Sequence, residues 1–97
     1  MKFIIKENQK ENINNQLRSL GYAFQGEDNN ELSFVKVFGQ NGYPRFHLYI
    51  KKEQDNLLFN LHLDQRRPVY NSGPAHSGEY DSPIVENEAE RVKQLLR

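Results

Sequence analysis

Three histidines carry most of the chain's potential for chemistry. His47 and His62 lie in two segments in which polar and apolar residues alternate, and His76 lies in a polar stretch without such alternation. Neutral imidazoles bind transition metal ions, and protonated imidazoles bind anions such as phosphate. The chemistry open to these residues depends on how the fold brings them together.

The two alternating segments, residues 45–52 and 57–64, predict an antiparallel hairpin. If Lys52 pairs with Leu57, apolar side chains oppose one another along one face, and a shift by one residue would mix the faces. On the other face, this register places His47 opposite His62. It also predicts two flanking pairs, Arg45–Asp64 and Tyr49–Asn60. Directly opposed side chains have Cβ atoms about 4.5–5.5 Å apart, so the two imidazoles can share a ligand, a metal ion or a phosphate.

The same residues also have a purely structural interpretation. Arg45 and Asp64 can form an ordinary cross-strand ion pair of small energetic weight. Histidines are readily tolerated on the solvated face of an antiparallel sheet. The sequence leaves the structural and the functional interpretation open.

A long irregular loop over residues 65–82 leaves the second strand of this hairpin. Loops longer than about 12–15 residues are usually functional or disordered. This one contains His76, Glu79 and Tyr80. If it folds across the sheet face, His76 would join His47 and His62 around a divalent metal such as zinc, with Glu79 as a general base. A mobile polar loop is the alternative.

The remaining pattern predicts a single α+β domain over residues 1–97. We expect a first helix that begins near Asn8 and ends at Gly21, a loop at residues 25–30, a strand at 32–38, and a last helix that opens after Ser82. The predicted fold is a three- to four-stranded antiparallel meander with both helices packed on one face, in α-β-β-β-α order. The fourth strand would be a short edge strand at residues 3–5.

The strand at residues 32–38 extends the histidine face if it pairs with residues 45–52. One workable register places Phe34, Lys36 and Phe38 on that face. Aromatic rings interleaved with basic groups are typical of surfaces that bind single-stranded nucleic acid.

The composition of the chain excludes several kinds of site and argues against others. The chain has no cysteine, which excludes disulfides, thiolate metal sites and a thiol nucleophile, and this favours a cytoplasmic location. Thirteen basic residues balance thirteen acidic ones, which argues against a strongly basic nucleic-acid footprint. The apolar run after Lys2 is too short for a signal peptide or a membrane span, so we expect no membrane partner.

Three stretches, YPRFHLYIK, FNLHLDQ and HSGEYD, resemble a group of short bacterial proteins to which no activity is assigned. The resemblance covers roughly the C-terminal two-thirds of the chain. It implies a small bacterial protein and carries no chemistry with it.

The first functional hypothesis is a binding module for a metal ion, a small anion or a protein partner. Its predicted binding residues are Lys36, Arg45, His47, Tyr49, His62, Asp64, His76 and Tyr80. The second hypothesis is a metal-assisted hydrolase of phosphoesters, in which the two hairpin histidines and His76 or Asp64 hold the ion and Glu79 is the base. The third, a weak nucleic-acid-binding domain, is disfavoured by the neutral overall charge.

Overall fold

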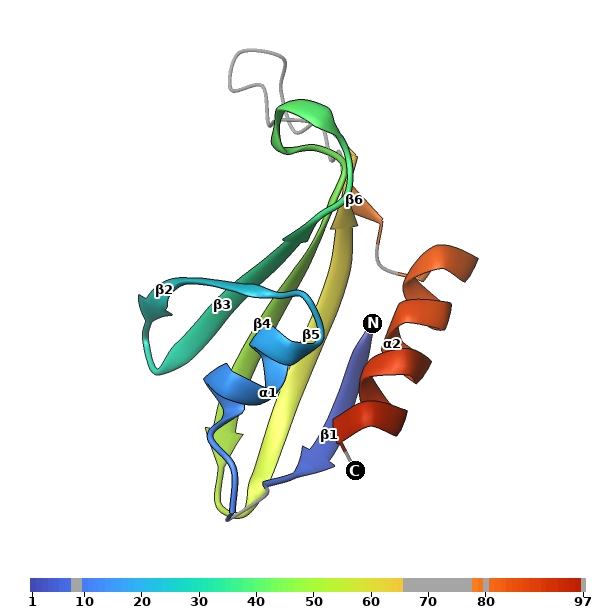
Figure 1. The fold of residues 1–97 in the computed structure, drawn as a ribbon. Coiled ribbons are helices and arrows are strands. Elements are labelled where there is room, and N and C mark those ends of the chain that lie inside the picture. The colour runs from blue at the N-terminus through green and yellow to red at the C-terminus, as the bar shows by residue number, and fades with distance from the viewer. Residues whose placement is uncertain (8–9, 66–77, 80, 97) are drawn as a thin grey trace.

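A curved antiparallel sheet with two helices forms the described part of the chain (Figure 1). The computed structural model describes residues 1–7, 10–65, 78–79 and 81–96, with no side-chain description for 78–79. The strands are β1 (Lys2–Lys6), β2 (Ala23–Asp28), β3 (Glu31–Val37), β4 (Arg45–Glu53), β5 (Asn56–Asp64) and β6 (Gly78–Glu79). The helices are α1 (Ile13–Ser19) and α2 (Pro83–Leu96), with a short 3-10 turn at Gln40–Gly42.

The order of the strands across the sheet is β1-β5-β4-β3-β2, and β6 also pairs with β5. Strands β2 to β5 follow one another as a meander, as Figure 1 shows. Strand β1 pairs with the first part of β5 and β6 with its last two residues, Leu63 and Asp64. Because β4 occupies the other edge of β5, β1 and β6 lie end to end along the same edge.

The predicted α+β class is confirmed, but the predicted strand number and the α-β-β-β-α order are wrong. The short edge strand expected at residues 3–5 is present as β1, but β2 adds a strand at residues expected to form a loop. Asn29 and Asn30 join β2 to β3 with positive φ angles of 52° and 63°, which is the backbone of a tight two-residue hairpin turn. Helix α1 is also shorter than predicted, because Asn12 caps it by accepting a hydrogen bond from the Asn14 amide at 2.7 Å.

Both helices cover one face of the sheet, as predicted. The hairpin register is confirmed on that face, where Phe46 opposes Leu63, Leu48 opposes Leu61 and Ile50 opposes Phe59. These side chains form one buried cluster with residues of both helices: Leu17 of α1 and Val85, Ala89, Val92 and Leu96 of α2. Burial of each large aliphatic or aromatic side chain contributes about 1.5–3 kcal/mol. Within the described residues, neither helix is long and apolar enough to cross a membrane.

A buried polar contact joins α2 to the segment between α1 and β2. The Tyr22 hydroxyl donates to Glu88 at 2.6 Å, and the Arg91 guanidinium donates to both oxygens of the same carboxylate at 2.7 and 2.8 Å. Arg91 also donates to the carbonyl oxygen of Leu20 at 3.0 Å. Burial raises the pKa of Glu88, but the hydrogen bonds from Arg91 and Tyr22 outweigh burial and hold it below its ordinary value. The carboxylate therefore stays ionised inside the fold.

We expect Tyr22→Phe to lower the free energy of unfolding by about 1–2 kcal/mol, because it removes one hydrogen bond from a buried carboxylate and leaves the ring in place. Chemical denaturation followed by circular dichroism measures the change. Tyr43→Phe is the matched control, because its hydroxyl forms no hydrogen bond with the described residues. Equal stability of the two variants would contradict a structural role for this contact.

Candidate metal centre

The β4–β5 hairpin places the two histidines opposite each other on the face that neither α1 nor α2 covers. His47 pairs with His62, Arg45 with Asp64, and Tyr49 with Asn60, all as predicted. The centroids of the two imidazole rings are 5.0 Å apart. The predicted histidine pair is therefore confirmed as a geometric feature.

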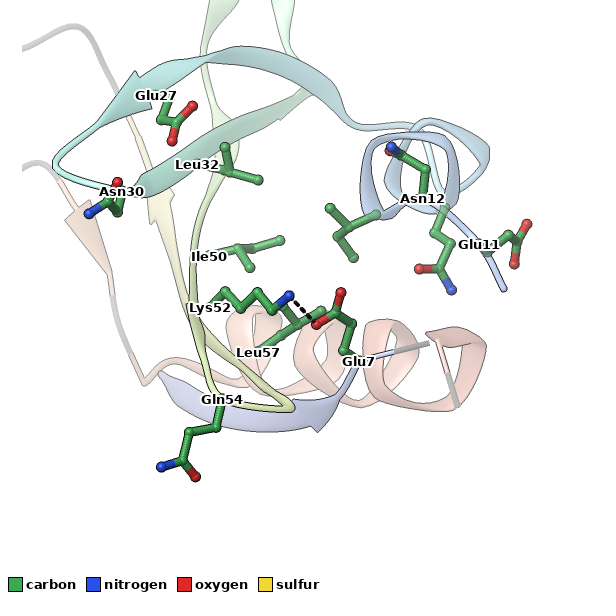
Figure 2. Close-up of a pocket in the computed structure, with 12 residues that line it drawn as sticks. Glu7, Glu11, Asn12, Glu27, Asn30, Leu32, Ile50, Lys52, Gln54 and Leu57 are labelled. Carbon is green, nitrogen blue, oxygen red and sulfur yellow. Dashed lines mark ion pairs between the residues drawn. The ribbon is translucent and has the colours of Figure 1, made fainter. Parts of the chain in front are cut away.

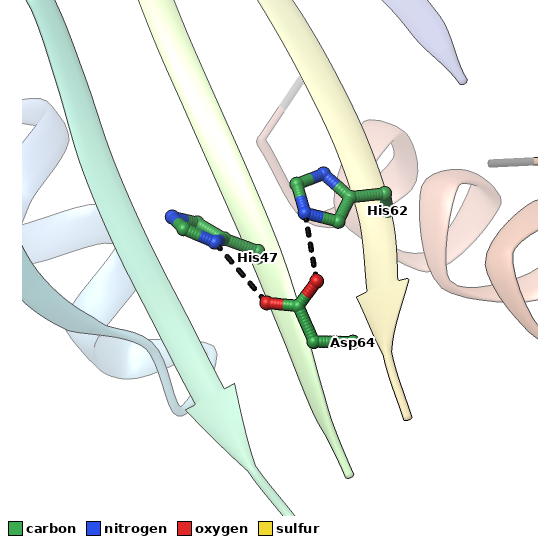
Figure 3. Close-up of side chains that lie close together, drawn as sticks. All are labelled: His47, His62 and Asp64. Carbon is green, nitrogen blue, oxygen red and sulfur yellow. Dashed lines mark hydrogen bonds and ion pairs between the residues drawn. The ribbon is translucent and has the colours of Figure 1, made fainter. Parts of the chain in front are cut away.

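Asp64 lies between the two imidazoles. One carboxylate oxygen, Oδ1, is 3.0 Å from Nε2 of His62, and the other, Oδ2, is 3.4 Å from Nδ1 of His47. Figure 3 shows one nitrogen of each imidazole ring turned toward the Asp64 carboxylate. Asp64 follows His62 by two positions in β5, so both side chains project from the same face of the strand. The ligand atoms of the three residues all lie within 4.8 Å of one another.

The three side chains are largely shielded from solvent. Their exposed fractions are 14% for His47, 9% for His62 and 16% for Asp64. Burial lowers the pKa of each imidazole below its ordinary value of 6.5, and the Asp64 charge only partly opposes this effect. For His47, the neighbouring His62 adds to the lowering. Both rings are therefore neutral at neutral pH and carry a lone pair that can bind a metal.

Two neighbours fix the orientation of the His47 ring. Its second nitrogen, Nε2, lies 2.7 Å from the Ser33 hydroxyl on β3. The Tyr49 ring stacks against it with the centroids 4.3 Å apart. The sequence predicts Tyr49 as a site residue but misses Ser33. The predicted register places Phe34 and Lys36 on the histidine face, whereas in the structure Ser33 and Val35 lie there.

The structure corrects the predicted position of Lys36. In β3, Val35 pairs with His47, so Lys36 pairs with Phe46 and lies on the face that the helices cover. There its charge helps to lower the pKa of Glu88. Phe34 likewise pairs with Leu48 and is only 1% exposed. On that face the Phe34 ring is part of the hydrophobic core. Neither Lys36 nor Phe34 therefore contributes to the histidine face.

Arg45 forms the predicted contact with Asp64. Its Nε atom lies 3.4 Å from Oδ2, the same oxygen that faces His47. The guanidinium also lies over the Tyr43 ring, 4.6 Å from its centroid. Arg45 therefore has a second partner that can hold it if Asp64 turns toward another cation.

The sequence also predicts that the long loop brings His76, Glu79 and Tyr80 to the site. His76 and Tyr80 lie outside the described residues. The backbone of Glu79 belongs to β6 and pairs with Leu63, but its side chain is outside the description. The loop therefore returns to the edge of β5 close to Asp64, while the roles of His76, Glu79 and Tyr80 stay predictions.

Comparisons of the chain with protein-family models, with curated proteins and with solved structures found no significant match. The resemblance to a group of short bacterial proteins therefore stays a prediction.

We expect the free energy of unfolding of the metal-free protein to decrease as the pH falls through 6.5, the ordinary imidazole value. The folded pKa values of His47 and His62 are lowered, so the unfolded chain takes up protons that the folded chain excludes. The slope is at most about 1.4 kcal/mol per pH unit for each imidazole. Denaturation at several pH values between about 7 and 5 measures this slope. The range lies above 4.5, the ordinary pKa of the Glu88 carboxyl, so that the titration of Glu88 adds little to the slope. His47→Gln should flatten the profile, and a flat profile in the unmodified protein would contradict the burial of neutral imidazoles.

Proposed function

We propose that this protein is a metal-binding module that holds a divalent transition ion such as zinc between His47, His62 and Asp64. The observation that carries the proposal is the convergence of three ligand atoms within 4.8 Å of one another on the sheet face that neither α1 nor α2 covers. Two imidazoles and a carboxylate are a ligand set that suits zinc and neighbouring transition ions.

The distances support such a site. Zinc–nitrogen and zinc–oxygen bonds of about 2.0–2.2 Å in tetrahedral geometry place neighbouring ligand atoms about 3.3–3.6 Å apart. The contacts of Asp64 with His62 and His47 measure 3.0 and 3.4 Å. The third side of the triangle, between the two ring nitrogens, is at most 4.8 Å. Three protein ligands leave the fourth position open for water, a further side chain or a ligand.

The Asp64 carboxylate and the neutral imidazoles favour a metal ion over an anion at this position, against the positive charges of Arg45 and the N-terminal ammonium. An anion would approach the Asp64 carboxylate, and it would require the two imidazoles to be protonated. Burial opposes protonation of both rings, and a metal ion requires them neutral. The site therefore suits a metal better than the small anion that the sequence also suggested.

Ser33 fits the role of an outer partner of the metal site. When Nδ1 of His47 binds an ion, the ring proton is on Nε2, which can donate to the Ser33 hydroxyl 2.7 Å away. Metal-binding histidines commonly donate their second ring N–H in this way, which fixes the tautomer and the ring orientation. Stacking on Tyr49 at 4.3 Å holds the same ring from its face.

The alternative functions have weaker support. Metal-assisted hydrolysis requires a general base, and the predicted base Glu79 has no described side chain. The predicted nucleic-acid surface loses Phe34 and Lys36, which lie on the helix-covered face. An enzymatic activity, a protein partner and the cytoplasmic location therefore stay predictions.

Asp64→Asn provides a sharp test because it removes the ligand charge and keeps the side-chain shape. We expect the chelator-treated protein to bind one Co²⁺ or Zn²⁺, measured by visible absorption and calorimetry. Asp64→Asn should weaken binding by more than the roughly 10–100-fold typical of variants of outer-shell partners.

His76→Gln is the comparison variant, with circular dichroism to confirm folding. Unchanged affinity in this variant would place the ligands on the hairpin, and lost affinity would identify His76 as a further ligand. Absence of stoichiometric binding by the unmodified protein would refute the proposal.

We also expect Arg45→Gln to tighten metal binding by about three- to tenfold, because the guanidinium competes for Asp64 Oδ2 and repels a cation. The same calorimetric titration, with Lys51→Gln as a control for the loss of a surface charge on β4, measures the effect. Weaker binding in Arg45→Gln would show that Arg45 supports the ligand set rather than competing with the ion.

A further inference from the structure

A cleft lies on the helix-covered face of the sheet, on the opposite side from the candidate metal centre. It has a volume of about 700 Å³, within the range of about 300–1,000 Å³ that is usual for small-molecule sites. Its floor is formed by Leu32, Ile50 and Leu57, which belong to the apolar face of β3, β4 and β5. Figure 2 shows these side chains on the sheet side of the cleft, with Asn12 and Glu11 across from them at the start of α1.

A buried amide also lines this cleft. Gln16 of α1 is only 9% exposed. Within the described part of the chain, its side-chain amide forms no hydrogen bond. Its amide atoms are not among the described side-chain atoms that are both fully buried and without a partner, so they are open to the cleft that the side chain lines. A ligand that donates a hydrogen bond to the Gln16 carbonyl oxygen would replace water there and displace no partner among the described residues.

The rim of the cleft is acidic. Glu7, Glu11 and Glu27 line it together with one basic side chain, Lys52. Lys52 pairs with Glu7 at 3.0 Å, the contact drawn in Figure 2, but its side chain is 63% exposed. Such an exposed pair is worth at most about 1 kcal/mol. Among the described residues, Glu11 and Glu27 have no ion-pair partner.

We propose that this cleft binds a small organic cation, with an ammonium or guanidinium group on an aliphatic body. The aliphatic body would cover Leu32, Ile50 and Leu57, and the cationic group would lie among the carboxylates. Its N–H groups would donate to the Gln16 carbonyl oxygen and to Glu11 or Glu27. A carboxylic acid of the same length would meet three negative charges and one basic side chain, Lys52.

Titration of the full chain with hexylammonium, followed by amide NMR, tests the proposal. We expect saturable shifts at the amides of Leu32, Ile50 and Leu57, and no such shifts with hexanoate at the same concentration. Absence of shifts with hexylammonium would overturn the proposal. Equal binding of hexanoate or of neutral hexanol would also overturn it, because the acidic rim would then make no contribution.

A matched pair of variants separates the carboxylate contribution from general surface charge. Glu27→Gln should weaken hexylammonium binding by about two- to fivefold, the effect of one exposed carboxylate. Glu53→Gln removes an exposed carboxylate of β4 that does not line the cleft, and it should leave the affinity unchanged. If Glu27→Gln and Glu11→Gln both bound hexylammonium as tightly as the unmodified chain, the proposal would be overturned. These outcomes are independent of metal binding at His47, His62 and Asp64.

Discussion

The antiparallel pairing of β4 with β5 is the constraint on which the rest of the structure depends. A single register opposes Leu48 to Leu61 on one face and His47 to His62 on the other. Because side chains alternate along a strand, a shift by one residue would exchange the two faces. The burial of the apolar face beneath α1 and α2 therefore also fixes the positions of the histidines. The stability of the core and the geometry of the candidate metal centre have a common origin.

This arrangement keeps two chemically different sites apart on the same strands. Ile50 contributes to the floor of the acidic cleft, while its neighbour Tyr49 stacks on His47 on the opposite face. Residues of α1 line the cleft, and neither α1 nor α2 covers the histidine face. A ligand at one site therefore makes no direct contact with the other.

The sequence predicts the part of the site that comes from one hairpin, because alternation and loop length together determine that register. It does not predict β2, which is a mostly exposed edge strand with an irregularity between Phe24 and Gly26 that interrupts alternation. It also misplaces Lys36 and misses Ser33. The β3–β4 register depends on the geometry of the turn at Gln40–Gly42, which composition does not define. The acidic cleft joins residues far apart in the chain, such as Gln16 and Lys52, so no local pattern indicates it.

The most direct measurement of the central claim is the ¹⁵N chemical shift of the imidazole nitrogens during titration with Zn²⁺. Direct ligation changes the shift of the nitrogen that binds the ion. The proposed site predicts that Nδ1 of His47 and Nε2 of His62 change together and that both changes are complete at one equivalent of zinc. Imidazole shifts of His47 and His62 that stay constant through the titration, while zinc binds elsewhere or not at all, would contradict the account.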